Sequence, residues 1–257
     1  TSGIVTATTD PVFQGPWGIA AGPDGALWFA VWDSGGAGTH GKRGGRGNAI
    51  GRITTRGAVT TFPDREILGP FGIVTGPDGA LWFTSYRGNS VGRITTRGKV
   101  TIYRDQSIRG PQNIAVGYDG ALWFTNRDSI GSITTPGGVA SFSDANLRGP
   151  WGIAAGPDRA LWFTNYRGGS IGRVTIDGRF RTFRHPSILG PRGITVGPDG
   201  ALWFVNNLGG SVGRITTRGV IAIFRDHRID RPWDIAHGPD GALWFGVVET
   251  YDATPYW

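Results

Sequence analysis

Short apolar segments alternate with glycine-rich turns along the chain, and one segment returns six times. The four residues Ala-Leu-Trp-Phe begin at Ala26, Ala80, Ala121, Ala160, Ala201 and Ala242. Successive copies are separated by 54, 41, 39, 41 and 41 residues. A period near forty residues with four strand-like segments per period is typical of β-propellers. The pattern therefore predicts an all-β protein, a six-bladed β-propeller with four antiparallel strands in each blade.

The repeat between residues 69 and 103 shows the expected blade. Its turns combine Pro, which sets one backbone dihedral, with Gly, which supplies a positive φ, as in Pro77-Asp78-Gly79. The second segment is continuously apolar, as expected for a strand that is buried on both faces. We expect strands over residues 71–76, 80–84, 91–95 and 100–103.

The two ends of the chain predict how the ring closes. Residues 2–8 align with the fourth strand of a repeat, residues 56–62, and residues 249–257 reach only the expected third strand of the last repeat. We therefore expect one domain, residues 1–257, closed by the N-terminal strand, which completes the last blade. The first blade carries a glycine-rich insertion over residues 33–48, which we interpret as a loop and a possible lid.

Composition narrows the function classes. The net charge is +7, and the chain contains no Cys, which excludes disulfides and thiol chemistry. The chain contains no run of eighteen apolar residues, which is the length needed for a helix that spans a membrane. No stacking motif accompanies the basic charge, so we do not expect nucleic acid as a partner. We expect a monomer that binds a small molecule, in the cytoplasm, with secretion as the alternative.

One face of the ring, here called the top face, concentrates the differences between blades. The residue after the Pro that opens each inner strand should ring the channel: Trp17, Phe71, Gln112, Trp151, Arg192 and Trp233. The third residue after each second strand should lie near it: Trp32, Tyr86, Arg127, Tyr166, Asn207 and Val248. Asn113 and Asp234 replace a Gly that the other four blades have after the ring residue. An apolar pocket with a few polar groups is the default ligand site. The alternative is that the aromatic residues fill the channel and that Arg192 pairs with Asp234.

A second recurring position lies between the fourth strand of one blade and the inner strand of the next. Because the same residue type returns there in five blades, we expect it to cap the loop and not to act in catalysis. The position holds Asp10, Asp64, Asp105, Asp144 and Asp226, with His185 in the sixth blade.

The motifs Pro-x-Gly-Ile, Gly-Pro-Asp-Gly-Ala-Leu-Trp-Phe-Thr and Ile-Gly-Arg-Ile-Thr together resemble the virginiamycin B lyase (streptogramin lyase) family over essentially the whole chain. The resemblance implies a seven-bladed propeller that opens a cyclic depsipeptide by magnesium-assisted elimination. It also implies catalytic His residues after the inner-strand Pro in two neighbouring blades, with a Glu before one such Pro.

This chain departs from that pattern. No blade has His after the inner-strand Pro, and Glu249 lies one residue beyond the position expected for a metal-binding Glu. The four His residues stand elsewhere, at His40, His185, His227 and His237. We therefore expect no metal and no cofactor, and six blades in place of the seven that the resemblance implies.

These observations favour a metal-independent enzyme of lyase or cyclase type that acts on an apolar or aromatic compound. Asp234 would be its acid or base, and Arg192 and Gln112 would hold developing negative charge. The expected substrate-binding residues are Trp17, Trp32, Phe71, Tyr86, Asn113, Arg127, Trp151, Tyr166, Asn207 and Trp233.

Three other functions stay open. One is a non-catalytic propeller that binds a sugar, a peptide or an aromatic ligand by stacking on Trp. Another is a divergent magnesium-dependent streptogramin lyase. A plain scaffold would use the basic turns at the bottom face, at Arg56, Arg97 and Arg218.

Overall fold

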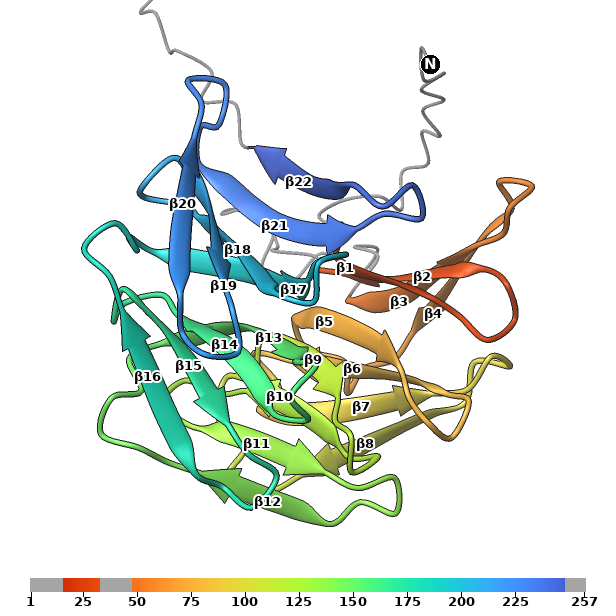
Figure 1. Ribbon diagram of the computed structural model, residues 1–257. Helices are drawn as coiled ribbons and strands as arrows, with labels where there is room; N and C mark the ends of the chain where they lie inside the picture. The colour runs from red at the N-terminus through yellow and green to blue at the C-terminus, as the bar shows by residue number, and fades with distance from the viewer. Residues whose placement is uncertain (1–15, 33–47, 248–257) are drawn as a thin grey trace, which may run out of the picture.

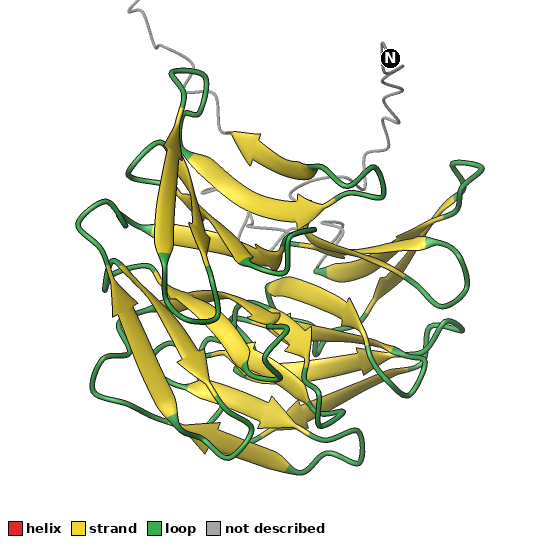
Figure 2. Cartoon of the chain, viewed as in Figure 1, coloured by secondary structure: helices red, strands yellow, loops and turns green. Residues whose placement is uncertain are grey.

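The computed structural model describes residues 16–32 and 48–247, and these contain strands and loops but no helix (Figures 1 and 2). The first three sheets contain β1 (Pro16–Ala21), β2 (Leu27–Val31), β3 (Ala49–Ile53), β4 (Val59–Pro63), β5 (Pro70–Thr75), β6 (Leu81–Ser85), β7 (Ser90–Ile94), β8 (Val100–Arg104), β9 (Ile114–Val116), β10 (Leu122–Thr125), β11 (Ile130–Ile133) and β12 (Val139–Phe142). The next three contain β13 (Pro150–Ala155), β14 (Leu161–Asn165), β15 (Ser170–Val174), β16 (Phe180–Arg184), β17 (Pro191–Val196), β18 (Leu202–Asn206), β19 (Ser211–Ile215), β20 (Ile221–Arg225), β21 (Pro232–His237) and β22 (Leu243–Val247).

The described strands form six sheets, one for each copy of the repeat. Five sheets have four antiparallel strands in chain order, and the sixth contains β21 and β22. The first strand of each sheet lies toward the middle of the ring and the fourth lies outside, as β13 and β16 show in Figure 1. The prediction of a six-bladed β-propeller is confirmed.

Residues 2–8 and 249–257, which were expected to complete the last blade, lie outside the described residues, as does nearly all of the 33–48 insertion. The described surfaces at this junction are apolar: Ile19 is 63% exposed, whereas Ile73, its counterpart one blade later, is 7% exposed. Trp244 is likewise 63% exposed, whereas Trp28 is fully buried. Closure of the ring by residues 2–8 stays a prediction.

The Gly of the third strand makes room for the Phe of the second. A Cβ atom built at Gly92 would lie 2.1 Å from Cζ of Phe83, which no side chain could tolerate. The same close approach recurs at Gly51, Gly131, Gly172 and Gly213. The paired motifs Ala-Leu-Trp-Phe and Ile-Gly-Arg-Ile are therefore two halves of one packing contact between neighbouring strands.

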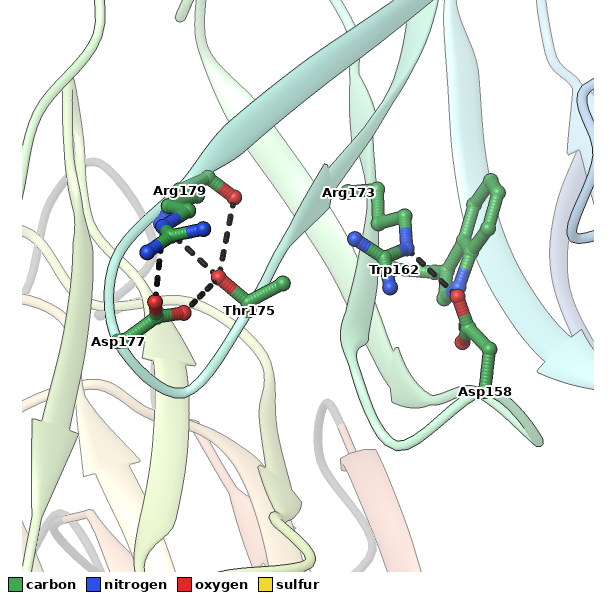
Figure 3. Close-up of polar contacts among 6 residues, drawn as sticks. All are labelled: Asp158, Trp162, Arg173, Thr175, Asp177 and Arg179. Atoms are coloured by element: carbon green, nitrogen blue, oxygen red, sulfur yellow. Dashed lines mark hydrogen bonds and ion pairs between the residues drawn. The ribbon is translucent and has the colours of Figure 1, made fainter.

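The Asp of the first turn holds the Trp of the second strand. Trp162 Nε1 donates to Asp158 Oδ1 (2.9 Å), and Arg173 Nε lies 2.6 Å from Asp158 Oδ2 (Figure 3). Three other blades repeat this triad, in Asp24–Trp28–Arg52, Asp78–Trp82–Arg93 and Asp199–Trp203–Arg214. The carboxylate thus satisfies the indole N–H of a largely buried ring and pairs with a cation at the bottom face.

Neighbouring blades pack through the buried residues of their first three strands. One cluster joins Trp162 and Ile171 of one blade to Ile194 and Phe204 of the next. Within the blade, the Trp162 ring stacks on Phe183, with centroids 5.1 Å apart. Burial of such rings supplies the apolar area on which a sheet without helices depends.

The recurring Asp between blades caps its own loop, as predicted. Asp64 Oδ1 accepts a hydrogen bond from the backbone N–H of Glu66 (2.8 Å). The equivalent bond is made by Asp105, Asp144 and Asp226, and by Nδ1 of His185. Asp10 lies outside the described residues.

We expect the propeller to lose stability in acid through the carboxylates of the first turns. Partial burial raises the pKa of Asp199, but the hydrogen bonds from Trp203 and Arg214 outweigh it and lower the pKa to about 2. The pKa values of Asp24, Asp78 and Asp158 are lowered by the same contacts. Because the pKa of Asp199 is lower in the folded protein than in the unfolded chain, its carboxylate stabilises the fold fully at pH values above the ordinary pKa of 3.8. This stabilisation is lost as the pH falls toward 2.

Urea unfolding followed by Trp fluorescence, from neutral pH down to about pH 2, measures this loss. The control is Asp199→Asn, whose amide cannot ionise. It should be less stable than the parent at neutral pH and should lose less stability in acid. A variant curve parallel to that of the parent would contradict the assignment.

Candidate functional site

A register shift at the start of the inner strand places the residue after Pro outside the regular ladder in five of the six described sheets. The register between β5 and β6 shifts between Pro70 and Ile73, so Phe71 and Gly72 stand outside the regular ladder. The same shift occurs in β1, β13, β17 and β21. In the third blade, β9 begins only at Ile114, after Gln112 and Asn113. Bulges re-aim side chains and are common next to functional sites.

Contacts between blades fix the backbone of the ring residues. Thr164 Oγ1 donates to the carbonyl of Arg192 (2.6 Å), and Thr125 Oγ1 donates to the carbonyl of Trp151 (2.7 Å). A Cβ atom at Gly152 would lie 2.5 Å from the Arg192 carbonyl oxygen, so the Gly after the ring residue is needed for this close approach. Asn113 uses the same position to donate from Nδ2 to the Trp151 carbonyl (3.1 Å).

Four aromatic ring residues, here called the aromatic plug, meet across the axis: Trp17, Phe71, Trp151 and Trp233. Trp17 stacks on Phe71 with centroids 4.7 Å apart and lies 5.8 Å from Trp233. Trp151 meets Phe71 and Trp233 edge-on, at 5.5 and 6.0 Å. Aromatic residues therefore meet across the middle of the ring, as the second alternative expected, but its other part, a pairing of Arg192 with Asp234, is not found among the described residues.

Arg192 lies against this plug. Its guanidinium carbon is 3.4 Å from the ring centroid of Trp233, 4.5 Å from that of Trp151 and 4.8 Å from that of Tyr166. The residue is only 8% exposed, and its Nε and Nη1 atoms have no hydrogen-bond partner among the described residues. Burial lowers the pKa of Arg192 below its ordinary value, and the Tyr166 hydroxyl partly opposes this.

Asp234 is the acid or base candidate from the sequence. In the described part of the chain no ion pair joins it to Arg192. Its Oδ1 accepts the backbone N–H of Ile235 (2.9 Å), and its side chain packs beside Gly193. The protein atoms packed around the carboxyl raise the pKa of Asp234, although the residue as a whole keeps an exposed surface.

A cavity of about 850 Å³ opens on the top face beside the plug. Eight of the predicted site residues line it: Trp17, Trp32, Phe71, Tyr86, Gln112, Arg127, Trp151 and Tyr166. Trp32 Nε1 and Gln112 Oε1 are buried and have no partner among the described residues. The plug therefore does not exclude a ligand site, because three of its members also form a wall of the cavity.

Five predicted residues do not line the cavity: Asn113, Arg192, Asn207, Trp233 and Asp234. Arg192 and Trp233 contact the wall residue Trp151 instead. Asn207 is 6% exposed and donates from Nδ2 to the carbonyls of Arg231 and Pro232, both at 3.2 Å. Asn113 and Asn207 thus bond the backbone of the next blade, and we do not carry them into the proposed site.

The sequence analysis missed part of the lining. Arg87, Asp128 and Arg167 directly follow the predicted residues Tyr86, Arg127 and Tyr166, and they also reach the cavity. The remaining missed residues are Asn89, Arg109, Gly110 and Gly149. A usable signal was present, because Tyr-Arg-Gly occurs after the second strand in two blades, at Tyr86 and Tyr166.

The donor set of the described residues does not fit magnesium. Mg²⁺ usually keeps several waters and is held by one or two carboxylates, whereas Asp128, the one carboxylate in the described lining, shares that lining with four arginines, which repel a cation. No group of three His, Cys, Asp or Glu side chains suited to a metal occurs among the described residues. Glu249 and His40 lie outside them.

The described chain also has no helix that is long and apolar enough to cross a membrane.

The comparisons with known proteins agree on one relationship. The model of the virginiamycin B lyase family matches residues 43–188. A streptogramin B lyase structure is 30% identical, with a TM-score of 0.78, over 92% of this chain and 84% of that one. Virginiamycin B lyase from Staphylococcus aureus is 31% identical, with a TM-score of 0.74, over 91% and 92%.

A catalytically inactive histidine-to-alanine variant of the Staphylococcus aureus protein, with quinupristin, is 31% identical, with a TM-score of 0.73, over 93% of this chain and 94% of that one. No curated protein sequence matches the chain.

We expect Arg192→Met to raise the free energy of unfolding by about 1–2 kcal/mol, because Met fills a similar space without a buried charge. Two guanidinium nitrogens without partners make the native Arg costly. The control is Arg127→Met, an exposed residue at the same cavity, which should change stability by less than about 0.5 kcal/mol. Urea unfolding measures both. A loss above about 1 kcal/mol in Arg192→Met would mean that the contacts with the ring faces outweigh the cost of burial.

Proposed function

The chain belongs to the virginiamycin B lyase family, and from this membership and the top-face cavity we propose that it is a small-molecule lyase acting on an aromatic compound. The observation that carries the proposal is the cavity of about 850 Å³ with six aromatic residues in its wall. Pockets of this size that combine an aromatic wall with polar groups are the usual sites of small ligands. The same side chains could also catalyse a ring-forming reaction, so the proposed enzyme is either a lyase or a cyclase.

The aromatic wall supports a flat or apolar substrate. Trp17, Trp32 and Tyr86 come from two neighbouring blades, and Trp151 and Tyr166 come from the fourth. An aromatic substrate ring between them would gain about 0.5–1.5 kcal/mol per ring pair beyond the area it buries. The exposed fraction of Trp17 and of Tyr86, 41% for each, leaves ring surface for such contacts.

The proton transfer of an elimination needs a base within hydrogen-bond reach of the substrate. Asp128 lines the cavity, so we propose it as the base that reaches the substrate directly. Asp234 remains the alternative from the sequence, because its raised pKa suits a base, but it lies outside the lining. In the reaction the base would take a proton from carbon, a double bond would form, and the leaving group would depart with the electron pair of its bond.

The negative charge that develops on the substrate would be held by nearby donors. Gln112 lies in the wall, and its side-chain amide carries two N–H groups. Arg192 lies behind Trp151 and Tyr166, where its positive charge acts across a short, water-poor distance. We propose Gln112 as the direct donor and Arg192 as an electrostatic and positioning residue.

We further propose that the reaction differs from that of the relatives. The inactive relative carries alanine in place of a histidine, and none of the six ring positions of this chain holds His. The cavity donors do not form a magnesium site, so no metal-assisted step is assigned to the described residues. The divergent magnesium-dependent streptogramin lyase remains the rival that the quinupristin test below addresses.

A non-catalytic binding propeller is the second candidate. It is favoured by one observation, that two of the three predicted catalytic residues, Arg192 and Asp234, do not line the cavity. Binding through the aromatic wall alone would need neither residue. Turnover of any compound that binds in the cavity separates the two candidates.

Quinupristin should remain intact when incubated with the protein and magnesium, because no His is available at the ring positions. Elimination gives a linear product of unchanged mass, so chromatographic retention and fragment masses are the measurement. The Staphylococcus aureus relative is the positive control. Conversion that requires magnesium and stops with a chelator would support the rival function and contradict metal independence.

Asp128→Asn should lower kcat by about a hundredfold or more on a substrate found by screening aromatic esters, lactones and depsipeptides, because it removes the base. Asp177→Asn is the control: this exposed carboxylate pairs with Arg179 in a turn between β15 and β16 (Figure 3) and should leave kcat unchanged. Asp234→Asn decides between the two candidate bases. A large loss there with full activity in Asp128→Asn would transfer the role to Asp234.

A further inference from the structure

The charge of the cavity lining is strongly unbalanced. Four guanidinium groups line it, from Arg87, Arg109, Arg127 and Arg167, against the single carboxylate of Asp128. Four positive charges less one negative charge leave a net charge of three positive units in the lining. All four Arg residues are exposed, and they come from loops of the second, third and fourth blades.

The arginines of the third strands, by contrast, are neutralised within their blades. The third-strand residues Arg52, Arg93, Arg173 and Arg214 each pair with the Asp of a first turn. None of the four cavity arginines has an ion-pair partner among the described residues. Arg87 lies over the Trp32 ring at 5.2 Å, and Arg109 Nε donates to the Gln106 carbonyl (3.1 Å). Neither contact removes the positive charge.

Two side chains of the lining also carry polar atoms without a partner. Trp32 Nε1 and Gln112 Oε1 are both buried, and neither has a partner in the described structure. Buried polar atoms are nearly always satisfied, so each of these side chains would gain a partner if it rotated toward a polar group of a bound molecule. The aromatic wall supplies the apolar contact for the rest of that molecule.

We propose that the cavity binds an aromatic compound that carries an oxyanion, a carboxylate or a phosphate. Its ring would lie on the aromatic wall and its oxyanion among the four arginines. The planar guanidinium matches both oxyanions with two parallel hydrogen bonds. The inference rests on the proposed function only for the location of the site, and it names the substrate class.

The test compares three probes of the same shape, 2-naphthoate, 2-naphthyl phosphate and the neutral 2-naphthamide. Binding is measured by calorimetry at low salt, and the two anionic probes show which oxyanion is preferred. At least one anion should bind about tenfold or more tightly than the amide. Added salt should weaken the anion and leave the amide nearly unchanged.

Variants locate the binding to the cavity. Arg127→Gln and Arg167→Gln should each weaken the preferred anion by about tenfold without changing the affinity of the amide. Both side chains are exposed and make no hydrogen bond within the described structure, and unchanged thermal unfolding would show that the fold is intact. The matched control is Arg104→Gln, which removes the same charge from a residue that pairs with Glu66 (3.3 Å) away from the cavity.

Equal affinity for all three probes, or binding by none, would overturn the inference, as would an equal loss in Arg104→Gln. A single-stranded oligonucleotide that binds more tightly than naphthyl phosphate would reassign the cations to nucleic acid and overturn it as well. The proposed function fails separately. Anion preference without turnover of any compound contradicts the lyase alone, and turnover of neutral compounds without anion preference contradicts this inference alone.

Discussion

One carboxylate in each first turn connects the parts of the blade that must stay together. In the fourth blade Asp158 accepts the Trp162 indole N–H and pairs with Arg173, so it joins the turn, the second strand and the third strand. A Trp buried between two sheets would otherwise leave its N–H unsatisfied, which is costly in an apolar interior. The third blade shows how far the triad can be reduced: Ser132 stands opposite Trp123 in place of the Arg, and Asp119 alone holds the indole. The indole contact is therefore the part of the triad found in all six described sheets.

Because this contact lies at the bottom face, the top face is free to vary. In the fourth blade the bulge places the Trp151 side chain outside the regular ladder, and Gly152, which follows it, allows the next blade to approach. The blades therefore have the same backbone arrangement and differ in the side chains that they carry at the top face. In four blades the residue after the inner-strand Pro is aromatic, and the four rings pack against one another. Arg192 adds a positive charge to the same cluster and has no carboxylate partner among the described residues. Structures keep such costs mostly at functional sites.

The sequence predicted the frame well and the site only partly, for a physical reason. Spacing and turn residues fix six repeated sheets, and Gly92 beneath Phe83 shows that even the motif glycines have a steric cause. Ring positions such as Trp17 and Gln112 could be placed because they follow a Pro at constant distance. Other loop residues could not be placed: Arg109 and Asp128 reach the cavity through the path of their loops, which the repeat period alone does not specify. Asn207 was placed on the correct face, yet its amide is used by the next blade, a contact that only three dimensions reveal.

Ion pairing distinguishes the arginines of the third strands from those of the cavity more clearly than residue type does. Arg is abundant at both faces, so composition and net charge alone suggest only a basic protein. At the bottom face Arg173 and Arg214 are paired within the blade, and their charge is largely cancelled over a few ångströms. At the cavity Arg127 and Arg167 face no carboxylate partner among the described residues, and an apolar wall beside them strengthens their field. The third-strand arginines are thus neutralised within the frame, whereas the four arginines of the cavity lining keep their charge beside the space where a ligand would enter.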